Sequence, residues 1–150
     1  MGYKIAVVGA TGNVGRELLS MLFERKFPAS EVVSLASQRS KGKQVSYGDK
    51  DVLICKALED YDFTGTDIAL FSPGSKVSAI YAPKAAKAGC VVIDNTSYFR
   101  MDPDVPLVVP EVNAHALKAY GKRNIIANPN CSTIQMVQVL GTLHAENPIK

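Results

Sequence analysis

Cysteine and histidine are scarce in this sequence. The 150 residues include three cysteines and two histidines, with no C-x-x-C pair and no histidine at metal-ligand spacing. An odd number of widely spaced cysteines does not build a disulfide framework, and a zinc site needs closely spaced Cys or His ligands. We therefore expect no disulfide, no bound metal, and a cytoplasmic setting in which thiols stay reduced.

Long apolar runs and clustered charge are also missing. No segment approaches the roughly 18 apolar residues of a membrane span. The start of the chain, MGYKIAVVGA, has an apolar run too short for a signal peptide. The net charge of +3 comes from scattered Lys and Arg, without a basic stripe or interleaved aromatic residues. Neither a membrane nor a nucleic acid is expected as a partner.

The sequence does contain a regular alternation of strand-length apolar runs and longer segments of helical period. Apolar residues make up 47% of the chain, enough for one domain with a buried core. The expected strands are 4–9, 31–37, 67–72, 90–96 and 124–128, and the expected helices are 14–26, 76–89, 114–121 and 132–146. This order is typical of an α/β, Rossmann-like, doubly wound fold with a mostly parallel sheet and helices on both faces.

Two stretches depart from this alternation. Residues 42–58 predict two short strands joined by the turn YGDKD, an antiparallel addition to the main sheet. Residues 97–113 are rich in proline and predict an irregular loop. Long loops in compact domains are often functional.

Three glycines lie where the first expected strand passes into the first helix. The stretch VVGATGNVGRELL carries Gly9, Gly12 and Gly15 at the C-terminal end of that strand and the start of the helix. The spacing is G-x-x-G-x-x-G, yet strand, glycines and helix come in the order that a dinucleotide-binding loop requires. Unpaired N–H groups and the helix dipole favour a pyrophosphate there. We therefore predict a dinucleotide site.

The end of the second strand distinguishes the two nicotinamide cofactors. NAD-binding domains carry an acidic residue there for the ribose 2′-OH. This chain reads SLASQRSKGK, without a carboxylate, and Ser37, Arg39 and Ser40 supply donors suited to a 2′-phosphate. Taken alone, each of these residues also fits a solvated loop. Together with the glycine loop, they favour NADP.

A cysteine lies at the start of the last expected helix, in NPNCST. Unpaired N–H groups and the helix dipole favour the thiolate of Cys131 over the thiol. Asn130 is suited to capping the helix or donating its amide to an oxyanion. A cysteine at a helix start is more often a small buried residue. Beside a nicotinamide site, however, Cys131 suits a nucleophile that holds an aldehyde while hydride leaves.

The motifs GATGNVG, ASQRSKGK, DNTSYFRMDPDVPLVVPEVN and NPNCST, in this order and spacing, resemble the N-terminal cofactor domain of bacterial aspartate-semialdehyde dehydrogenases. The resemblance covers nearly the whole chain, and its last two motifs are the most specific. It implies an NADP-dependent, homodimeric, cytoplasmic enzyme of lysine (through diaminopimelate), threonine and methionine biosynthesis. In that family the cysteine attacks aspartate semialdehyde, hydride passes to NADP, and phosphate displaces the thioester to give aspartyl phosphate. The physiological direction is the reverse.

The resemblance also implies the site residues. Cys131 would be the nucleophile with Asn130 beside it, and Arg100 would bind the phosphate or acyl phosphate, for which its planar fork is suited. Glu111 and Asn113 are assigned to orienting the loop. With the residues identified above, the expected cofactor contacts are Gly9, Thr11, Gly12, Asn13, Val14, Ser37, Arg39, Ser40, Ser72 and Gly74.

One part of the family pattern is missing. The resembling enzymes take their base histidine, and the arginine that grips the substrate carboxylate, from a second domain. The only histidines here are His115 and His144, and His144 lies more than three helical turns after Cys131. We therefore expect residues 1–150 to be a truncated NADP-binding domain, inactive alone, without the second catalytic and dimerisation domain.

Four alternatives are weighed against this identification. N-acetyl-glutamyl-phosphate reductase also uses a cysteine thioester, but its motif resembles N-P-G-C-Y. Glyceraldehyde-phosphate dehydrogenase would show S-C-T-T and an acidic residue after the second strand, and a short-chain dehydrogenase or epimerase would need Y-x-x-x-K; the sequence has none of these. A non-catalytic NADP-sensing module would explain the glycine loop but leave Cys131 and Arg100 without a role.

Overall fold

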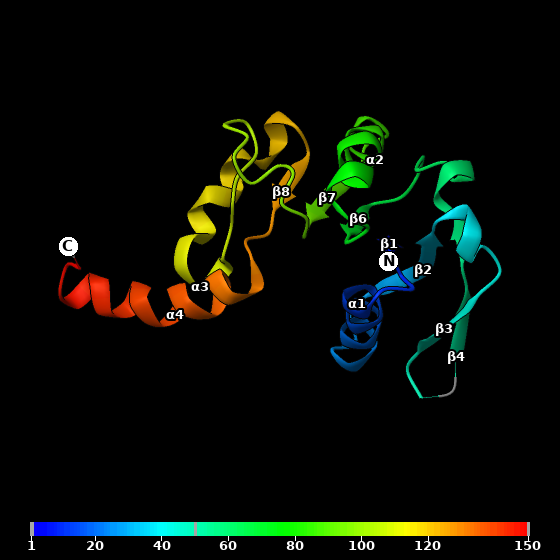
Figure 1. Cartoon of the computed structure of the whole chain (residues 1–150), viewed down its shortest axis with the longest axis horizontal. Coiled ribbons are helices and arrows are strands. Elements are labelled where there is room, and N and C mark those ends of the chain that lie inside the picture. Colours follow the sequence, from blue (N-terminus) through cyan, green and yellow to red (C-terminus); the bar gives the residue numbers. More distant parts are fainter. Residues whose placement is uncertain (1, 50, 150) are drawn as a thin grey trace.

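A six-stranded parallel sheet in the order β5-β2-β1-β6-β7-β8 forms the centre of the molecule (Figure 1). The computed structural model describes residues 2–49 and 51–149. The sheet strands are β1 (Tyr3–Val8), β2 (Ala29–Ala36), β5 (Lys56–Ala57), β6 (Ile68–Phe71), β7 (Val91–Asp94) and β8 (Ile125–Ala127). The helices are α1 (Asn13–Glu24), α2 (Ser75–Lys87), α3 (Pro110–Asn113) and α4 (Cys131–Glu146), with 3-10 turns η1 (Gln38–Ser40), η2 (Leu58–Asp60) and η3 (Ala114–Lys122). The predicted Rossmann-like fold is confirmed.

Side chains of β1 alternate between two cores, because successive residues of a strand point to opposite faces. Ile5 and Val7 pack with Leu19 of α1 on one face. Ala6 and Val8 belong to the other core, to which α2 contributes the small buried side chains of Ala82, Ala85 and Ala86. Figure 1 shows α1 and α2 on opposite faces of the sheet. The predicted doubly wound arrangement follows from this alternation.

The stretch 42–58 divides between two sheets. The strands β3 (Gln44–Tyr47) and β4 (Asp51–Ile54) form the predicted antiparallel pair. The prediction was wrong for the residues that follow, because β5 leaves the hairpin and pairs in parallel with β2. Cys55 is 1% exposed and Ala57 is 2% exposed, whereas Ile54 remains 62% exposed. Burial of Cys55 and Ala57 in the core therefore accompanies the change of sheet.

The proline-rich loop contains more regular structure than predicted. Pro110 begins α3, where its missing N–H has no helical partner to lose. The short helix expected over 114–121 is the 3-10 helix η3. Asn113 orients the loop as predicted, since its amide donates to Leu107 O at 2.9 Å and accepts from Val109 N at 2.8 Å. Glu111 is exposed.

The last helix, α4, extends away from the sheet and approaches α3 (Figure 1). None of its residues is buried, and Met136, Val139 and Leu143 are among its exposed apolar side chains. Even so, none of the helices in residues 2–49 and 51–149 has both the length and the apolarity needed to cross a bilayer.

Cys90 lies completely buried just before β7. Its thiol is 3.6 Å from the carbonyl oxygen of Phe63, to which it donates. Burial, and to a lesser extent the nearby Asp67 carboxylate, raise the pKa of the Cys90 thiol from 9.0 to about 11. The residue is a core side chain, as its place in the strand pattern predicts.

This buried thiol predicts a loss of stability at alkaline pH. The unfolded chain ionises Cys90 near its ordinary pKa of 9.0, while the folded chain keeps it protonated up to about 11. The stabilisation is therefore fully present below pH 9 and is lost as the pH rises toward 11. We expect the free energy of unfolding, from urea titrations, to fall by about 2 kcal/mol more in the wild type than in Cys90→Ala across this range. Parallel losses in the two proteins would contradict the assignment.

Candidate functional site

The glycine loop between β1 and α1 requires glycine at two positions. Gly9 has a φ of +87°, and a Cβ there would lie 2.6 Å from the carbonyl oxygen of Ser72. At Gly15 an added Cβ would lie 2.2 Å from the carbonyl oxygen of Gly9. The loop therefore passes close to the end of β6 and folds tightly against the first turn of α1. Any side chain at Gly9 or Gly15 would push these segments apart.

The start of α1 keeps unpaired donors. Gly12 is its N-cap residue, no side chain caps the helix, and its first turn has no acidic residue. The first N–H groups of an α-helix lack partners within the helix. The loop itself is anchored to β2, because Gly9 N and Ala10 N donate to Leu35 O at 2.9 and 3.1 Å. This fixed, donor-rich helix start is suited to a phosphate group.

A cavity of about 270 Å³ lies beside the loop, a size that fits part of a dinucleotide. Residues from the glycine loop, the ends of β2 and β6, η2 and α2 surround it, namely Gly9, Thr11, Gly12, Ala36, Ser37, Leu58, Glu59, Ser72, Pro73, Val77 and Tyr81. Five of these are predicted cofactor residues: Gly9, Thr11, Gly12, Ser37 and Ser72. The other five, Asn13, Val14, Arg39, Ser40 and Gly74, do not line the cavity. Four of them lie within two residues of one that does, and Ser40 lies three residues after Ser37.

Sequence reasoning missed the residues that close the cavity from the side. Leu58 and Glu59 come from η2, and Val77 and Tyr81 come from α2. The place of η2 depends on β5 pairing with β2, which the sequence did not indicate. Val77 and Tyr81 are four residues apart on one helix face, a spacing that signals a shared surface but not a ligand.

The η1 turn carries Arg39 directly after β2. Ser40 N donates to Ser37 O at 2.7 Å, which closes the turn. Lys41 pairs with Asp60 at 3.0 Å and thereby lowers the pKa of that carboxyl. Arg39 is exposed and forms no ion pair with any residue of 2–49 and 51–149. Its guanidinium is available to a ligand.

Cys131 is the first residue of α4, one position earlier than predicted, and its side chain is exposed. Asn130 caps the helix, because its Oδ1 accepts from Ser132 N at 3.0 Å and from Ser132 Oγ at 2.7 Å. The Cys131 Sγ lies 3.8 Å from the same oxygen. The capping alternative is therefore confirmed for Asn130, and its Nδ2 forms no hydrogen bond within the part of the chain that the structure describes.

A hydrogen-bond network joins the ends of β7 and β8 immediately before this cysteine. Arg100 Nε donates to Asn128 O, and Arg100 Nη2 donates to Asn95 O, both at 3.0 Å. The Asn128 amide donates to Asn95 Oδ1 at 2.7 Å. Arg100 is thus half-buried and fixed by two backbone carbonyls, with its Nη1 left without a partner among the described residues. The network places Arg100 beside the segment that ends at Cys131.

A buried carboxylate directly precedes Asn95, a member of this network. Asp94, at the end of β7, is completely buried. Its Oδ1 accepts from Ser78 Oγ at 3.0 Å and from Thr96 N at 2.9 Å, and its Oδ2 accepts from Thr96 Oγ1 at 2.9 Å. Sequence reasoning missed Asp94, although an Asp with a Thr two residues later is a known turn signal.

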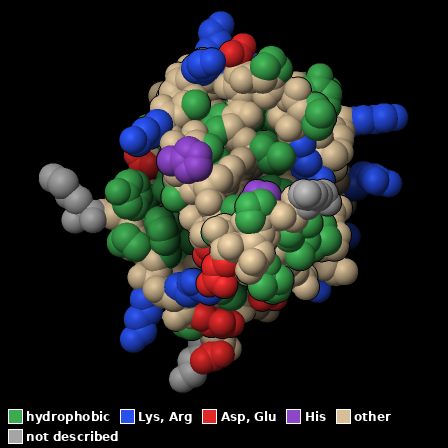
Figure 2. Space-filling model, turned by 90° about the vertical axis from the view of Figure 1, so that its left-hand side faces the viewer, with side chains coloured by type: hydrophobic (Ala, Val, Ile, Leu, Met, Phe, Trp, Pro, Cys, Tyr) green, Lys and Arg blue, Asp and Glu red, His purple; other side chains and the backbone are tan. Residues whose placement is uncertain are grey.

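Neither histidine is a partner of the cysteine. His144 Nδ1 accepts a hydrogen bond from Ile149 N at 3.0 Å, which ties it to the end of α4 opposite Cys131. Figure 2 shows both histidines on a face with exposed hydrophobic side chains, viewed from the side of α4. Within residues 2–49 and 51–149, the Cys131 Sγ has no hydrogen bond to a basic group. These residues hold a nucleophile without a base.

Comparisons with known proteins identify the family of this chain. Residues 4–120 match the family of the semialdehyde dehydrogenase NAD-binding domain. All 150 residues align at 54% identity with 44% of the aspartate-semialdehyde dehydrogenase of Aquifex aeolicus. The crystal structure of aspartate semialdehyde dehydrogenase II from Vibrio cholerae, complexed with ASA, matches 97% of this chain and 47% of its own at 50% identity and a TM-score of 0.92. The crystal structure of the Candida albicans aspartate semialdehyde dehydrogenase with NADP matches 99% of this chain and 48% of its own at 26% identity and a TM-score of 0.76. The chain spans less than half the length of these relatives.

Removal of the buried carboxylate should destabilise the fold. Asp94→Ala leaves the hydroxyls of Ser78 and Thr96 and one backbone N–H without an acceptor in the core. We expect a loss of about 3 kcal/mol in the free energy of unfolding, measured by urea denaturation. The control is Asp104→Ala, which removes an exposed ion pair with Lys122 and should cost less than about 1 kcal/mol. Equal costs would contradict the structural role of Asp94.

The three cysteines should differ in reactivity. Cys131 is exposed, while Cys55 and Cys90 are 1% and 0% exposed and react only when the fold opens. We expect iodoacetamide at neutral pH to label Cys131 far ahead of the other two, as mapped by peptide mass. In concentrated urea, iodoacetamide should label the three cysteines at similar rates. Labelling of Cys90 before Cys131 in the folded chain would show that the exposed thiol is not the reactive one.

Proposed function

The chain belongs to the semialdehyde dehydrogenase family, and from this we propose that it is the NADP-binding, nucleophile-bearing part of an aspartate-semialdehyde dehydrogenase. One observation carries the proposal: the exposed Cys131 begins α4 in a segment tied through Asn128 to Arg100. The glycine loop follows β1 in the same parallel sheet, whose strand ends share one edge. Ligands bind at this edge in open α/β folds.

In the proposed reaction, the Cys131 thiolate attacks the aldehyde carbon of aspartate semialdehyde and forms the oxyanion of a hemithioacetal. Loss of hydride converts it to a thioester, and a phosphate oxygen then attacks the acyl carbon and releases the thiolate. The products are aspartyl phosphate and the free cysteine. When bound, NADP would take up the hydride in this direction and supply it in the reverse, biosynthetic direction.

Two side chains, one next to the cysteine and one tied to the segment before it, suit the charges of this reaction. Arg100 would hold the phosphate, because its guanidinium is already fixed by two carbonyls and keeps Nη1 available. Asn130 would stabilise the oxyanion of the hemithioacetal through its amide Nδ2, since its Oδ1 is engaged in capping α4.

We assign NADP rather than NAD as the cofactor. The proposed contacts are Gly9, Thr11, Gly12, Asn13, Val14, Ser37, Arg39, Ser40, Ser72 and Gly74. Support comes from the donors that follow β2, from Arg39, which has no ion-pair partner among the described residues, and from the structure of the Candida albicans relative with NADP. Glu59 is the only carboxylate among the residues that line the cavity, and it suits a ribose hydroxyl or the adenine amino group rather than a phosphate.

The remaining parts of the reaction are assigned to a second domain outside residues 1–150. It would supply the base, the arginine for the substrate carboxylate and the contacts of a homodimer. The length of the relatives and the missing base beside Cys131 support this division. We place the protein in the cytoplasm, because a catalytic thiol has to stay reduced.

A chimeric enzyme tests the proposed function. Residues 1–150 replace the matching N-terminal part of the Aquifex aeolicus enzyme, with which they align over their whole length. We expect phosphate-dependent NADPH formation from aspartate semialdehyde by the chimera. The 150-residue chain alone should be inactive, since general acid–base help and substrate positioning are each worth about two or more orders of magnitude.

Cys131→Ser in the chimera should abolish this activity, and Arg100→Ala should raise the phosphate concentration needed. A folded chimera that binds NADP but forms no NADPH would sink the assignment. Robust turnover by the 150-residue chain would instead reveal a base within it.

A further inference from the structure

Arg16 is a cation of the nucleotide-loop helix that has no role in the site described above. It follows Gly15 in the first turn of α1, and its side chain is exposed. Its backbone N–H donates to Gly12 O at 3.0 Å. Its guanidinium forms no ion pair with any residue in 2–49 and 51–149. The charge is thus uncompensated next to the loop.

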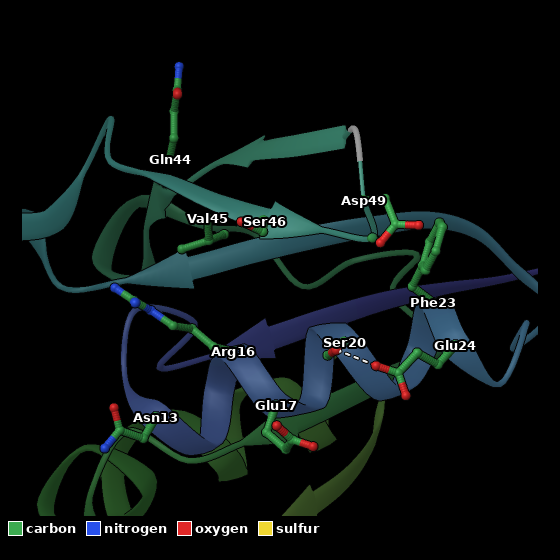
Figure 3. A pocket seen from close by; sticks show the side chains of 11 residues that line it. Asn13, Arg16, Glu17, Ser20, Phe23, Glu24, Gln44, Val45, Ser46 and Asp49 are labelled. Carbon is green, nitrogen blue, oxygen red and sulfur yellow. Dashed lines mark hydrogen bonds between the residues drawn. The ribbon is translucent and has the colours of Figure 1, made fainter.

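Arg16 lines a second cavity, of about 610 Å³, between α1 and β3. Its charges are divided along the helix (Figure 3). The positive Arg16 lies with the neutral Asn13 at the end where α1 begins, whereas the negative Glu24 and Asp49 lie at the opposite end. Glu17 points away from the β3 strand. An anion is therefore favoured only at the end next to the glycine loop.

The core packed between α1 and β3 includes the end of β2. Ala36, the last residue of β2, is buried in one core cluster with Leu19 of α1 and Val45 of β3. Val45 also lines the cavity with Arg16, which precedes Leu19 by one helical turn. Figure 3 shows the Arg16 side chain extending from α1 toward the end of β2. The turn that carries Arg39 begins directly after that strand end.

We propose that Arg16 is a second cation for the 2′-phosphate of NADP, acting with Arg39; this inference rests on the proposed function. A phosphate monoester carries nearly two negative charges at neutral pH, so one guanidinium leaves it partly uncompensated. Arg39 approaches from the turn after β2, and Arg16 approaches from α1. The planar guanidinium of each can form two hydrogen bonds to phosphate oxygens. NAD lacks this phosphate, so Arg16 should not increase its affinity.

Calorimetric titration of the 150-residue chain with NADP⁺, NAD⁺ and adenosine 2′,5′-bisphosphate tests this role. Arg16→Gln should weaken NADP⁺ and the bisphosphate about five- to tenfold, the effect of one exposed charge contact, and leave NAD⁺ unchanged. Arg39→Gln should act in the same direction. The matched control is Arg25→Gln, which removes an exposed arginine from the other end of α1 and should change none of the three affinities.

The outcomes separate this inference from the proposed function. If Arg16→Gln binds NADP⁺ like the wild type while Arg39→Gln binds it more weakly, the role of Arg16 is overturned and the NADP preference stands. Equal weakening of NAD⁺ and NADP⁺ by Arg16→Gln also overturns it, because Arg16 would then act on a group that both nucleotides share. A wild type that binds both nucleotides equally, or neither, overturns the NADP preference and this inference together.

Discussion

The hydrogen bonds from Arg100 to the backbone carbonyls of Asn95 and Asn128 are the constraint on which the candidate site depends. Neighbouring parallel strands are not joined by a hairpin at their ends, so β7 and β8 need another tie beyond the last ladder bond. The side-chain bond between Asn128 and Asn95 adds a second tie at 2.7 Å. Because Asn128 precedes Cys131 by three residues, these contacts also determine where α4 begins.

The buried Asp94 extends this constraint to the nucleotide side of the molecule. Its carboxylate accepts from Ser78 on α2 and from Thr96 in the loop after β7. The same helix contributes Val77 and Tyr81 to the cavity beside the glycine loop. One carboxylate therefore connects the helix that borders the nucleotide cavity with the strand end that supports the cysteine segment. A buried polar network of this kind orients its members only when each one is satisfied.

The charged side chains are distributed as expected for a site with two parts, one for the nucleotide and one around the cysteine. The glycine loop, Arg39 and Arg16 lie around the strand ends and helix start proposed to bind NADP, and the negative Glu24 and Asp49 lie at the far end of α1. Next to Cys131 the described residues supply the Asn130 amide, and no basic group among them hydrogen-bonds to the thiol. This geometry fits the electrostatic stabilisation that the proposed reaction needs, while its proton transfer requires a base from elsewhere.

The sequence by itself determined the features that depend on short-range backbone geometry. These are the glycine loop, the alternation of strands and helices, and the last helix with its Asn130 cap, although the helix begins at Cys131, one residue earlier than expected. These leave local signals in glycine spacing, apolar period and capping residues. Only the tertiary structure decided that β5 joins β2, that η2 and α2 border the cavity, and that Arg100 bonds a carbonyl 28 residues away. Contacts between distant segments depend on strand order and burial, and these leave no periodic trace in the sequence.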